Sequence, residues 1–469
     1  MRYATLEVVY AYQQSTDKFW IHRQEELYRE GGICVKTDVF ITGGGIGGLT
    51  LALKLVKAGI DVVMVEKLPG KQPVYKGELL QPKSMQIFDG LQVFEEITSQ
   101  GQIIEVLDLI ELSKTLKVKD QSFMDYTVIP GKYNAAYMIH HEVLKGIIRT
   151  KAESYSNFHY FSGSSCKSID GKVATVQKGK EQFDVEASFF IGAEGRASVT
   201  RQAMGIKVEP IKYNHHFITV TFPRPTNFVG GQIFSSYNRF LGLFPLPNDE
   251  VRSVYLIPAG DYKKIKEKSI DHFHKLYTEL APAIDGYVQK LVDWSKIQLM
   301  IPIMYHADTY VSGNMAIIGD AAHAVHPMAG EGMNMAIQDA DILGELLVDM
   351  YKQQKLNLEN LNQYEAVRKE RADYLIQLSH LSALAYSFPF QPVSWLRSKT
   401  FERMEEDPVL HFKQMLNVSG LGMWKESVRD RFIQGGMMPT RKKELPKEQK
   451  EMKLFTAEDD YPWKWRGLR

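Results

Sequence analysis

A run of five glycines in six residues, Gly43–Gly48, constrains the fold of this 469-residue chain more than any other feature. It follows the apolar, strand-like residues 38–42 and precedes residues 49–58, whose apolar side chains recur at helical spacing. A second strand-like segment, residues 61–66, comes next. The order strand, glycine turn, helix, strand is typical of a βαβ unit, so the sequence predicts an α/β protein with a parallel sheet.

Three of these glycines fit the Gly-x-Gly-x-x-Gly pattern of a dinucleotide-binding turn. Gly43 permits the tight turn, Gly45 lets the backbone approach a pyrophosphate, and Gly48 lets the helix pack closely against the strand. The helix start, which includes Ile46 and Gly47, presents free N–H groups that favour phosphate. The turn is therefore predicted to hold the phosphates of a dinucleotide.

Glu66 ends the second strand, about 20 residues past the turn, where an acid accepts hydrogen bonds from ribose hydroxyls. An acid at this place disfavours a 2′-phosphate, so the predicted site suits FAD or NAD better than NADP. Lys67 follows directly and is assigned to the same cofactor site.

The charge of the chain is nearly balanced, with 57 Lys and Arg residues against 56 Asp and Glu residues. This balance argues against a global electrostatic grip on nucleic acid. Cys34 and Cys166 are too few for a disulfide scaffold or a four-thiolate metal site. The pairs His140–His141 and His215–His216 lack carboxylate or thiol partners at ligand spacing, so we predict no metal.

No apolar stretch approaches the roughly 20 residues that span a bilayer, so no transmembrane segment is predicted. Residues 1–30 carry scattered charges where a signal peptide would need an apolar run. Together with the few cysteines, this predicts a cytoplasmic protein.

The remaining patterns predict a second sheet and several helices. Alternating apolar residues indicate antiparallel strands at 215–222, 240–246 and 251–258, with a hairpin turn at 247–250. Apolar spacing predicts a strand at 314–319 and helices at 19–30, 271–294, 333–351 and 361–386. The first of these helices lies in an N-terminal extension, residues 1–36, whose role the sequence leaves open.

Two further motifs follow the glycine turn in order. They are Gly-Ala-Glu-Gly-Arg-Ala-Ser-Val-Thr-Arg at 192–201, and Gly-Asp-Ala-Ala-His at 319–323 followed by Pro327, Gly330, Gly332 and Asn334. With the glycine turn, they resemble the p-hydroxybenzoate hydroxylase type of group A flavoprotein monooxygenases. The segment 78–82 is similar to one in the quinone-biosynthesis and squalene-epoxidase branches, and residues 364–371 resemble the helix that follows the third motif in these relatives.

The resemblance implies a cycle in which NADH or NADPH reduces FAD and O2 adds to the reduced flavin. A flavin hydroperoxide then hydroxylates or epoxidises an aromatic or olefinic apolar small molecule. It also implies a Rossmann-like FAD-binding domain with an inserted antiparallel β-sheet substrate domain and a helical C-terminal region. The predicted ranges are 37–107, 132–203 and 300–352 for the FAD-binding domain, 108–131 and 204–299 for the substrate domain, and 353–469 for the C-terminal region.

The resemblance places the second and third motifs at the cofactor. Glu194 and Gly195 belong to a motif implicated in both FAD and NAD(P)H binding. Asp320, after Gly319, ends a predicted strand at the ligand-binding edge of the sheet, where it can hydrogen-bond the ribityl chain. A carboxylate that only caps a helix is the alternative for Asp320.

The end of the third motif is predicted to lie against the flavin ring. Pro327 turns the chain, and Gly330 and Gly332 let the backbone lie flat against a ring. The helix that begins near Met333 and Asn334 then points its positive end at the pyrimidine side, where a reduced flavin carries negative charge.

Several residues depart from the pattern of the family or match it only loosely. Glu78 and Gln81 lie in the segment similar to one that runs under the flavin, although an ordinary helix start is the alternative. Glu194 replaces aspartate, and Glu331 replaces a common glutamine and is expected to add negative charge near the flavin. His141 stands where an arginine usually contacts FAD, and an imidazole can still donate to phosphate.

The substrate is predicted to lie between the flavin and the antiparallel sheet. Pro327 is assigned to the catalytic residues, together with His215 or Tyr213 as a general base that deprotonates a phenol. Core packing is the alternative for the predicted substrate contacts, which are Tyr213, His215, Phe217, Tyr237, Phe244 and Met328.

Other functions on the same scaffold stay open. The chain lacks the Trp-x-Trp-x-Ile-Pro motif of flavin halogenases, but an FAD-dependent reductase, dehydrogenase or halogenase and a non-catalytic flavin or ligand binder are the alternatives to a monooxygenase. A monomer or homodimer is expected, and the region after about residue 380 is able to cap the pocket, form a dimer surface or contact a membrane face peripherally.

Overall fold

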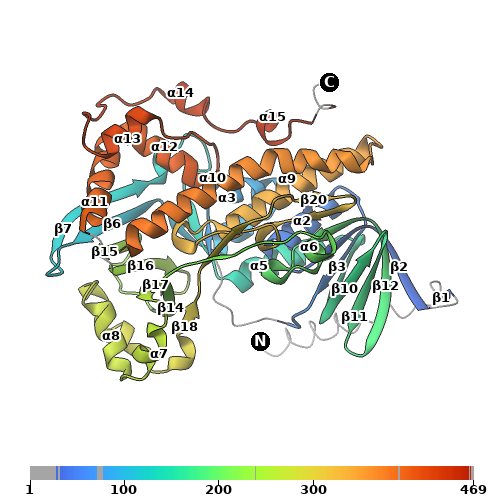
Figure 1. Cartoon of the computed structure of the whole chain (residues 1–469), viewed down its shortest axis with the longest axis horizontal. Coiled ribbons are helices and arrows are strands. Elements are labelled where there is room, and N and C mark those ends of the chain that lie inside the picture. The colour runs from blue at the N-terminus through green and yellow to red at the C-terminus, as the bar shows by residue number, and fades with distance from the viewer. Residues whose placement is uncertain are drawn as a thin grey trace.

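The computed structural model describes residues 28–29, 32–70, 78–237, 239–388, 391–463 and 465. Most of the expected N-terminal extension lies outside these residues. The helix predicted at 19–30 is wrong at its end, because β1 (Tyr28–Arg29) pairs antiparallel with the start of β2 (Gly32–Thr42). The other described residues form two large sheets, two small three-stranded sheets and a set of C-terminal helices, which confirms the predicted α/β class (Figure 1).

The larger sheet has nine strands and a parallel centre. Its central strands are β12 (Glu181–Gly192), β2, β3 (Val62–Glu66), β9 (Phe158–Ser162) and the short β21 (Met315–Ile317). Thr42 pairs with Gly192 and Val65, and Gly192 pairs with Ile317, so these strands end at one edge. The glycine turn and the two later motifs each follow one of these strand ends, and the sheet therefore brings all three together.

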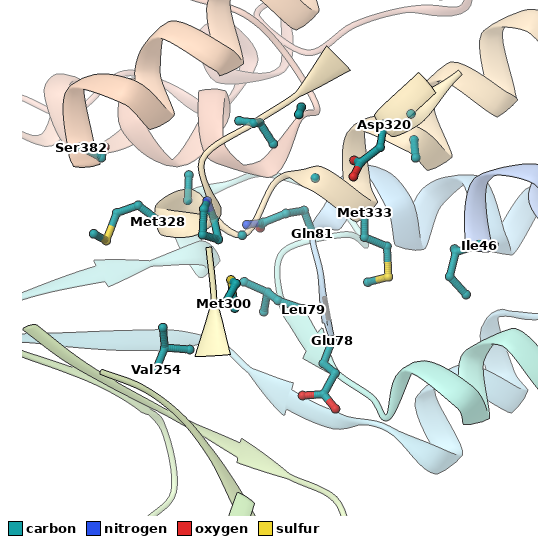
Figure 2. Close-up of a pocket in the computed structure, with 18 of the residues that line it drawn as sticks. Ile46, Glu78, Leu79, Gln81, Val254, Met300, Asp320, Met328, Met333 and Ser382 are labelled. Carbon is teal, nitrogen blue, oxygen red and sulfur yellow. The ribbon is translucent and has the colours of Figure 1, made fainter. Parts of the chain in front are cut away.

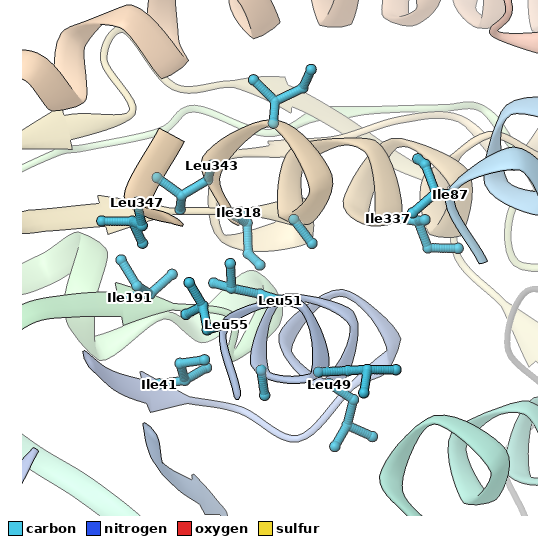
Figure 3. Packing of buried hydrophobic residues seen from close by; sticks show 14 of the residues in the cluster. Ile41, Leu49, Leu51, Leu55, Ile87, Ile191, Ile318, Ile337, Leu343 and Leu347 are labelled. Carbon is cyan, nitrogen blue, oxygen red and sulfur yellow. The ribbon is translucent and has the colours of Figure 1, made fainter. Parts of the chain in front are cut away.

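Three helices cover the face of this sheet that forms the main core, α5 (His141–Glu153) and two others. α2 (Ile46–Lys57) follows the glycine turn and ends where Gly59 takes a left-handed φ of 85°. α9 (Gly332–Lys352) follows the third motif and lies beside α2. Figure 3 shows the apolar contact between them and the sheet, made by Ile41, Leu51, Leu55, Ile191, Ile318, Leu343 and Leu347, all nearly inaccessible to solvent.

The second sheet has seven strands, and most neighbours are antiparallel as predicted. In order, its strands are β18 (Gln298–Met300), β14 (His215–Pro223), β17 (Glu250–Pro258), β16 (Arg239–Leu246), β15 (Gly231–Ser236), β6 (Val106–Leu112) and β7 (Val118–Asp125). β15 and β6 are parallel, which is possible because a long stretch of chain connects them. The domain boundaries stay a prediction.

The helix expected over 271–294 is wrong in length. α8 (Ile270–Thr278) ends early, and separate 3-10 turns follow it at Pro282–Ile284, Val288–Lys290 and Trp294–Lys296. Pro282 cannot continue a helix, and Gly286 takes a left-handed φ of 80°. The apolar residues still reach the core of the second sheet, and Phe273, Leu280 and Ile284 are buried.

The C-terminal region is helical as predicted. α10 (Asn362–Ser387) packs on both α9 and the second sheet, and α11 (Gln391–Glu406), α12 (Pro408–Ser419) and α13 (Val428–Gln434) follow it over that sheet (Figure 1). Near the C-terminus, Asp460 forms ion pairs with Lys83 at 2.5 Å and Arg371 at 2.6 Å. Among the described residues, no helix is both long and apolar enough to cross a membrane.

Candidate cofactor and substrate site

A large cavity lies where the carboxyl ends of the parallel strands meet the second sheet. Its volume is about 1510 Å³, which exceeds the roughly 300–1,000 Å³ of a typical site for one small ligand. Figure 2 shows Ile46, Asp320 and Met333 toward one end, and Met328, Val254 and Ser382 toward the other. The cavity therefore has room for a dinucleotide and a second molecule.

Most of the residues predicted to bind the cofactor line this cavity. They are Gly43, Gly45, Ile46, Gly47, Gly48, Glu66, Lys67, Glu78, Gln81, His141, Glu194, Gly195, Gly319, Asp320, Pro327, Gly330, Gly332 and Met333. Of the predicted substrate contacts, Phe217, Phe244 and Met328 line it as well. Glu331, Asn334, Tyr213, His215 and Tyr237 do not, although the first two lie directly behind the lining.

The glycine turn has the shape that a pyrophosphate requires. A Cβ on Gly43, which has a φ of 99°, would lie 2.4 Å from the carbonyl oxygen of Ala193, and one on Gly48 would lie 2.2 Å from that of Gly43. A Cβ on Gly45 would meet no protein atom within 4 Å. Two glycines are thus needed for packing, whereas the third borders open space beside the start of α2, which fits the phosphates of FAD.

Glu66 supports the turn and also faces the cavity. Its Oε2 accepts a hydrogen bond from the backbone N–H of Gly44 at 2.7 Å, and its Oε1 accepts one from that of Leu68 at 2.8 Å. Because a carboxylate offers about four acceptor sites, capacity remains for ribose hydroxyls.

The longer side chain of Glu194 has a local use. Its carboxylate accepts hydrogen bonds from Ser198 Oγ at 2.8 Å, Thr200 Oγ1 at 2.7 Å and the Thr200 backbone N–H at 3.0 Å. It therefore holds the start of the short helix α6 (Val199–Ala203). Arg201 at the end of the same motif donates to the carbonyl oxygen of Ala321 at 2.8 Å, which ties the second motif to the third.

Behind the third motif lies a buried ionic cluster formed by Asp339, His323 and Arg368. Asp339 Oδ2 accepts from the Gly319 N–H at 2.9 Å and contacts His323 Nε2 at 2.7 Å, and its Oδ1 accepts from Arg368 Nε at 2.8 Å. Burial alone would raise the pKa of Asp339, but His323 and Arg368 outweigh it and hold that pKa well below its usual value. Sequence reasoning missed Asp339, whose only signal was an acid near the apolar stripe of α9.

Asn334 does not line the cavity, but it holds three residues that do. Its side chain accepts from the Gln81 backbone N–H at 2.9 Å and donates to the carbonyl oxygens of Leu79 and Gly330, both at 3.0 Å. These three residues line the cavity, so Asn334 fastens the segment after Glu78 to the loop before α9.

Burial opposes the negative charge expected at Glu331. Its side chain is buried, and neither carboxyl oxygen meets hydrogen-bonding geometry with a partner in the described part of the chain. Burial raises the pKa of Glu331 well above its usual value, and the nearby Gln81 side chain offsets only part of this. Burial therefore favours the protonated, neutral form of Glu331, which is close in charge and shape to the glutamine common in the family.

Glu78 links the cofactor half of the cavity to the second sheet. It forms a two-pronged ion pair with Arg252 of β17, with distances of 2.6 Å to Nε and 2.7 Å to Nη2. Burial would raise the pKa of Glu78, but His140, whose Nδ1 lies 3.7 Å from Oε1, and the hydrogen-bonded Arg252 outweigh it and lower that pKa. The helix start proposed as the alternative also occurs, since α3 (Pro82–Gly90) begins one residue after Gln81.

Tyr213 and His215, the candidate bases, do not line the cavity, and their role stays a prediction. His215 Nε2 lies 2.8 Å from Nε2 of His326, and Tyr213 Oη lies 2.9 Å from Nδ1 of His380. Burial lowers the pKa of His215 to about 4 and that of His326 to about 3, so both rings are neutral at neutral pH. His326 Nδ1 accepts a hydrogen bond from the Met328 backbone N–H at 3.2 Å. His326 and the neighbouring His215 therefore support the Pro327 loop on the side away from the cavity.

Tyr237 also lies away from the cavity. It occupies the turn between β15 and β16, where the ammonium of Lys114 lies 5.7 Å from the centre of its ring. No group of three or more His, Cys, Asp or Glu side chains within the described ranges could hold a metal ion.

The comparisons with known proteins agree with this geometry. The model of the FAD binding domain family matches residues 36–379, which is well over half of the chain. The chain therefore belongs to this FAD-binding family, and its resemblance to the group A flavoprotein monooxygenases is confirmed.

Two curated relatives are named as oxygenating enzymes. The chain is 25% identical over 345 residues to 6-methylpretetramide 4-monooxygenase of Streptomyces rimosus, covering 72% of this chain and 81% of the relative. It is 26% identical over 381 residues to the ubiquinone hydroxylase UbiL of Rhodospirillum rubrum, covering 77% and 84%.

Solved structures share the fold at lower identity. The p-nitrophenol 4-monooxygenase PnpA of Pseudomonas putida superposes with a TM-score of 0.73 at 16% identity, over 82% of this chain and 98% of that one. PqsL of Pseudomonas aeruginosa, solved in complex with 2-aminobenzoylacetate, gives 0.69 at 21% identity, over 76% and 99%.

Proposed function

We propose that the protein is an FAD-dependent monooxygenase that uses NADH or NADPH and O2 to hydroxylate or epoxidise an aromatic or olefinic apolar small molecule. The observation that carries this proposal is the continuity of the cavity, which joins a dinucleotide-binding turn to an apolar wall on the second sheet. The relatives named as a monooxygenase and a hydroxylase of ring compounds support the same reaction class.

The residues at the glycine-rich end would hold the cofactor. The open space beside Gly45 and the first turn of α2 receive the pyrophosphate, and Glu66 accepts from ribose. His141, the first residue of α5 (His141–Glu153), adds a donor at a second helix start. Asp320 faces the cavity with its carboxylate 3.6 Å from Arg196 Nε, and it would accept from the hydroxyls of the ribityl chain.

The loop from Pro327 to Gly332 would place the reactive ring of FAD. FAD supplies the hydride-accepting and O2-activating chemistry when it is bound. Gly330, with a left-handed φ of 68°, ends the 3-10 turn and leads into α9, whose positive end favours negative charge on the ring. Burial favours the protonated form of Glu331, which would keep a competing negative charge away from this place.

The apolar wall would exclude water and orient the substrate. Phe217 and Phe240 pack with Met300 and Met328 at the substrate end of the cavity. Such a wall shields the reaction from water, and aromatic and thioether groups suit a ring substrate. Oligomeric state and a cytoplasmic location stay predictions.

The proposal predicts that the protein purifies with FAD and that a suitable substrate stimulates its oxidation of NADH or NADPH. The test follows the loss of nicotinamide absorbance under O2 with a panel of neutral phenols and quinols, and it measures hydrogen peroxide in parallel. Stimulated oxidation with little peroxide is expected. Oxidation that yields only peroxide with every compound would favour a reductase or oxidase on the same scaffold.

A further inference from the structure

The cavity continues past the Pro327 loop into a space between the second sheet and the C-terminal helices. We call this space the apolar arm. Its walls are defined by Ile233, Phe240 and Val254 from the sheet and by Leu378, Ala385 and Phe401 from α10 and α11. Figure 2 shows Val254, Met328 and Ser382 around its inner part, on the side away from Ile46 and Asp320.

The charged side chains that line this part of the cavity are paired with opposite charges. Arg252 pairs with Glu78 at 2.6 Å, and Arg397 pairs with the buried Glu111 at 2.8 Å. At the outer end Arg431 lies 3.1 Å from Glu426. An anionic substrate group would lose its hydration here beside cations whose charge is already balanced, although Arg397 Nε keeps a buried N–H without a hydrogen-bond partner in the described residues. Such a loss of hydration is costly in a mostly apolar site.

The outer end of the arm opens to solvent between apolar side chains. Leu381 of α10 and Leu396 of α11 both line the cavity, yet they are 54% and 46% exposed. Trp395, next to Leu396 in sequence, is also exposed, at 57%. Exposed apolar groups clustered at a cavity mouth are typical of a ligand groove, so an apolar chain can extend out of the arm here.

We propose that the substrate is a neutral aromatic ring that carries an apolar chain, with the ring at the Pro327 loop and the chain in the apolar arm. This inference rests on the proposed function, because the flavin defines the end at which the ring reacts. Each methylene that the arm buries should tighten binding about fourfold, the factor that corresponds to about 0.8 kcal/mol per buried CH2. Benzoates, whose carboxylate finds no free cation, should bind at least tenfold more weakly than phenols with the same chain.

The test titrates the FAD-loaded protein with para-alkylphenols and para-alkylbenzoates of increasing chain length. Binding is read from the change in the visible absorption of the oxidised flavin, without turnover. The phenols are expected to bind more tightly with each added carbon until the arm is filled, and the benzoates to bind weakly throughout. Binding that is independent of chain length, or benzoates that bind as tightly as phenols, would overturn the inference.

Variants of α10 test where the alkyl chain of the substrate lies. Ser382→Trp fills part of the arm, so phenol binding should stop tightening at a shorter alkyl chain than in the wild type. Ala385→Leu should have the same effect to a smaller extent. Leu384→Trp is the matched control, since Leu384 lies on the same helix but does not line the cavity. The FAD content of each variant shows that it has folded, and an equal response of Leu384→Trp would contradict the proposed position.

The proposed function and this inference fail in different ways. A protein that takes up no FAD contradicts the proposed function, whereas an FAD-loaded protein with no chain-length dependence contradicts only the substrate class.

Discussion

Replacement of Gly45 by valine is expected to abolish FAD binding and to leave the fold intact. Gly45 has a φ of −75° and a ψ of 178°, an extended conformation that any residue adopts. A Cβ there meets no protein atom within 4 Å, so the change introduces no clash at Cβ, and the loss of the N-cap glycine costs the apoprotein only about 1 kcal/mol. The new side chain instead occupies the space through which the backbone approaches the pyrophosphate.

The expected loss is at least 100-fold in FAD affinity. Two or more hydrogen bonds to a charged phosphate contribute about 1.5–3 kcal/mol each, and about 1.4 kcal/mol corresponds to a factor of ten. The measurement is FAD affinity by fluorescence titration of the apoprotein, together with its unfolding by urea. Retention of FAD by Gly45→Val would show that the phosphates lie elsewhere.

Two other glycines provide controls with opposite outcomes. Gly146→Val in α5 also places its Cβ in open space, but away from the cavity, and should change neither FAD affinity nor folding appreciably. Gly48→Ala should destabilise the fold itself, since its Cβ would lie 2.2 Å from the carbonyl oxygen of Gly43.

Replacement of Asp339 by alanine is expected to produce the largest loss of stability. The carboxylate is fully buried, and its removal leaves the equally buried guanidinium of Arg368 without its ionic partner. Breaking one side of a buried ion pair costs about 3–5 kcal/mol. The free energy of unfolding in urea at neutral pH measures the change, and a loss below about 1 kcal/mol would contradict the role given to this cluster.

The surface pair Lys36–Glu186 is the matched control for Asp339. Its side chains are 64% and 43% exposed at a separation of 3.1 Å. Glu186→Ala should therefore change stability by only about 0–1 kcal/mol.

The contribution of Asp339 to the free energy of unfolding should also depend on pH. Its pKa is depressed in the folded protein, so its contribution to stability is fully present above the unfolded value of about 4 and is lost as the pH falls below it. The difference in stability between the wild type and Asp339→Ala should narrow between neutral pH and about pH 3. A stability difference that stays constant over this range would show that the pKa of Asp339 is not depressed in the folded protein.

The parallel sheet and the cofactor half of the site were predictable because local sequence encodes them. Gly43, Gly45 and Gly48 have backbone requirements that neighbouring residues reveal, and Glu66 follows a strand whose apolar run is unmistakable. The third motif likewise combines Asp320 with a strand end and a helix start.

The substrate half was less predictable because it depends on contacts between distant segments. Alternation along β14 placed His215 and Phe217 on the same face, but it did not show that the cavity ends at Phe217 and that His326 covers His215. The parallel pairing of β15 with β6 and the pair between Glu78 and Arg252 join segments more than one hundred residues apart. The contribution of α11 to the cavity was one of three alternatives left open for the region after about residue 380, because its mixed polar and apolar sequence does not distinguish among them.

The central claim is that this protein transfers an oxygen atom from O2 to an apolar ring or olefin. The most direct measurement is a single reaction of the FAD-loaded protein with NADH or NADPH and isotopically heavy O2, followed by mass spectrometry of the organic product. With a phenol of the type that fills the apolar arm, one heavy oxygen atom should appear in the product. A product without heavy oxygen, or peroxide as the sole destination of the label, would contradict the account.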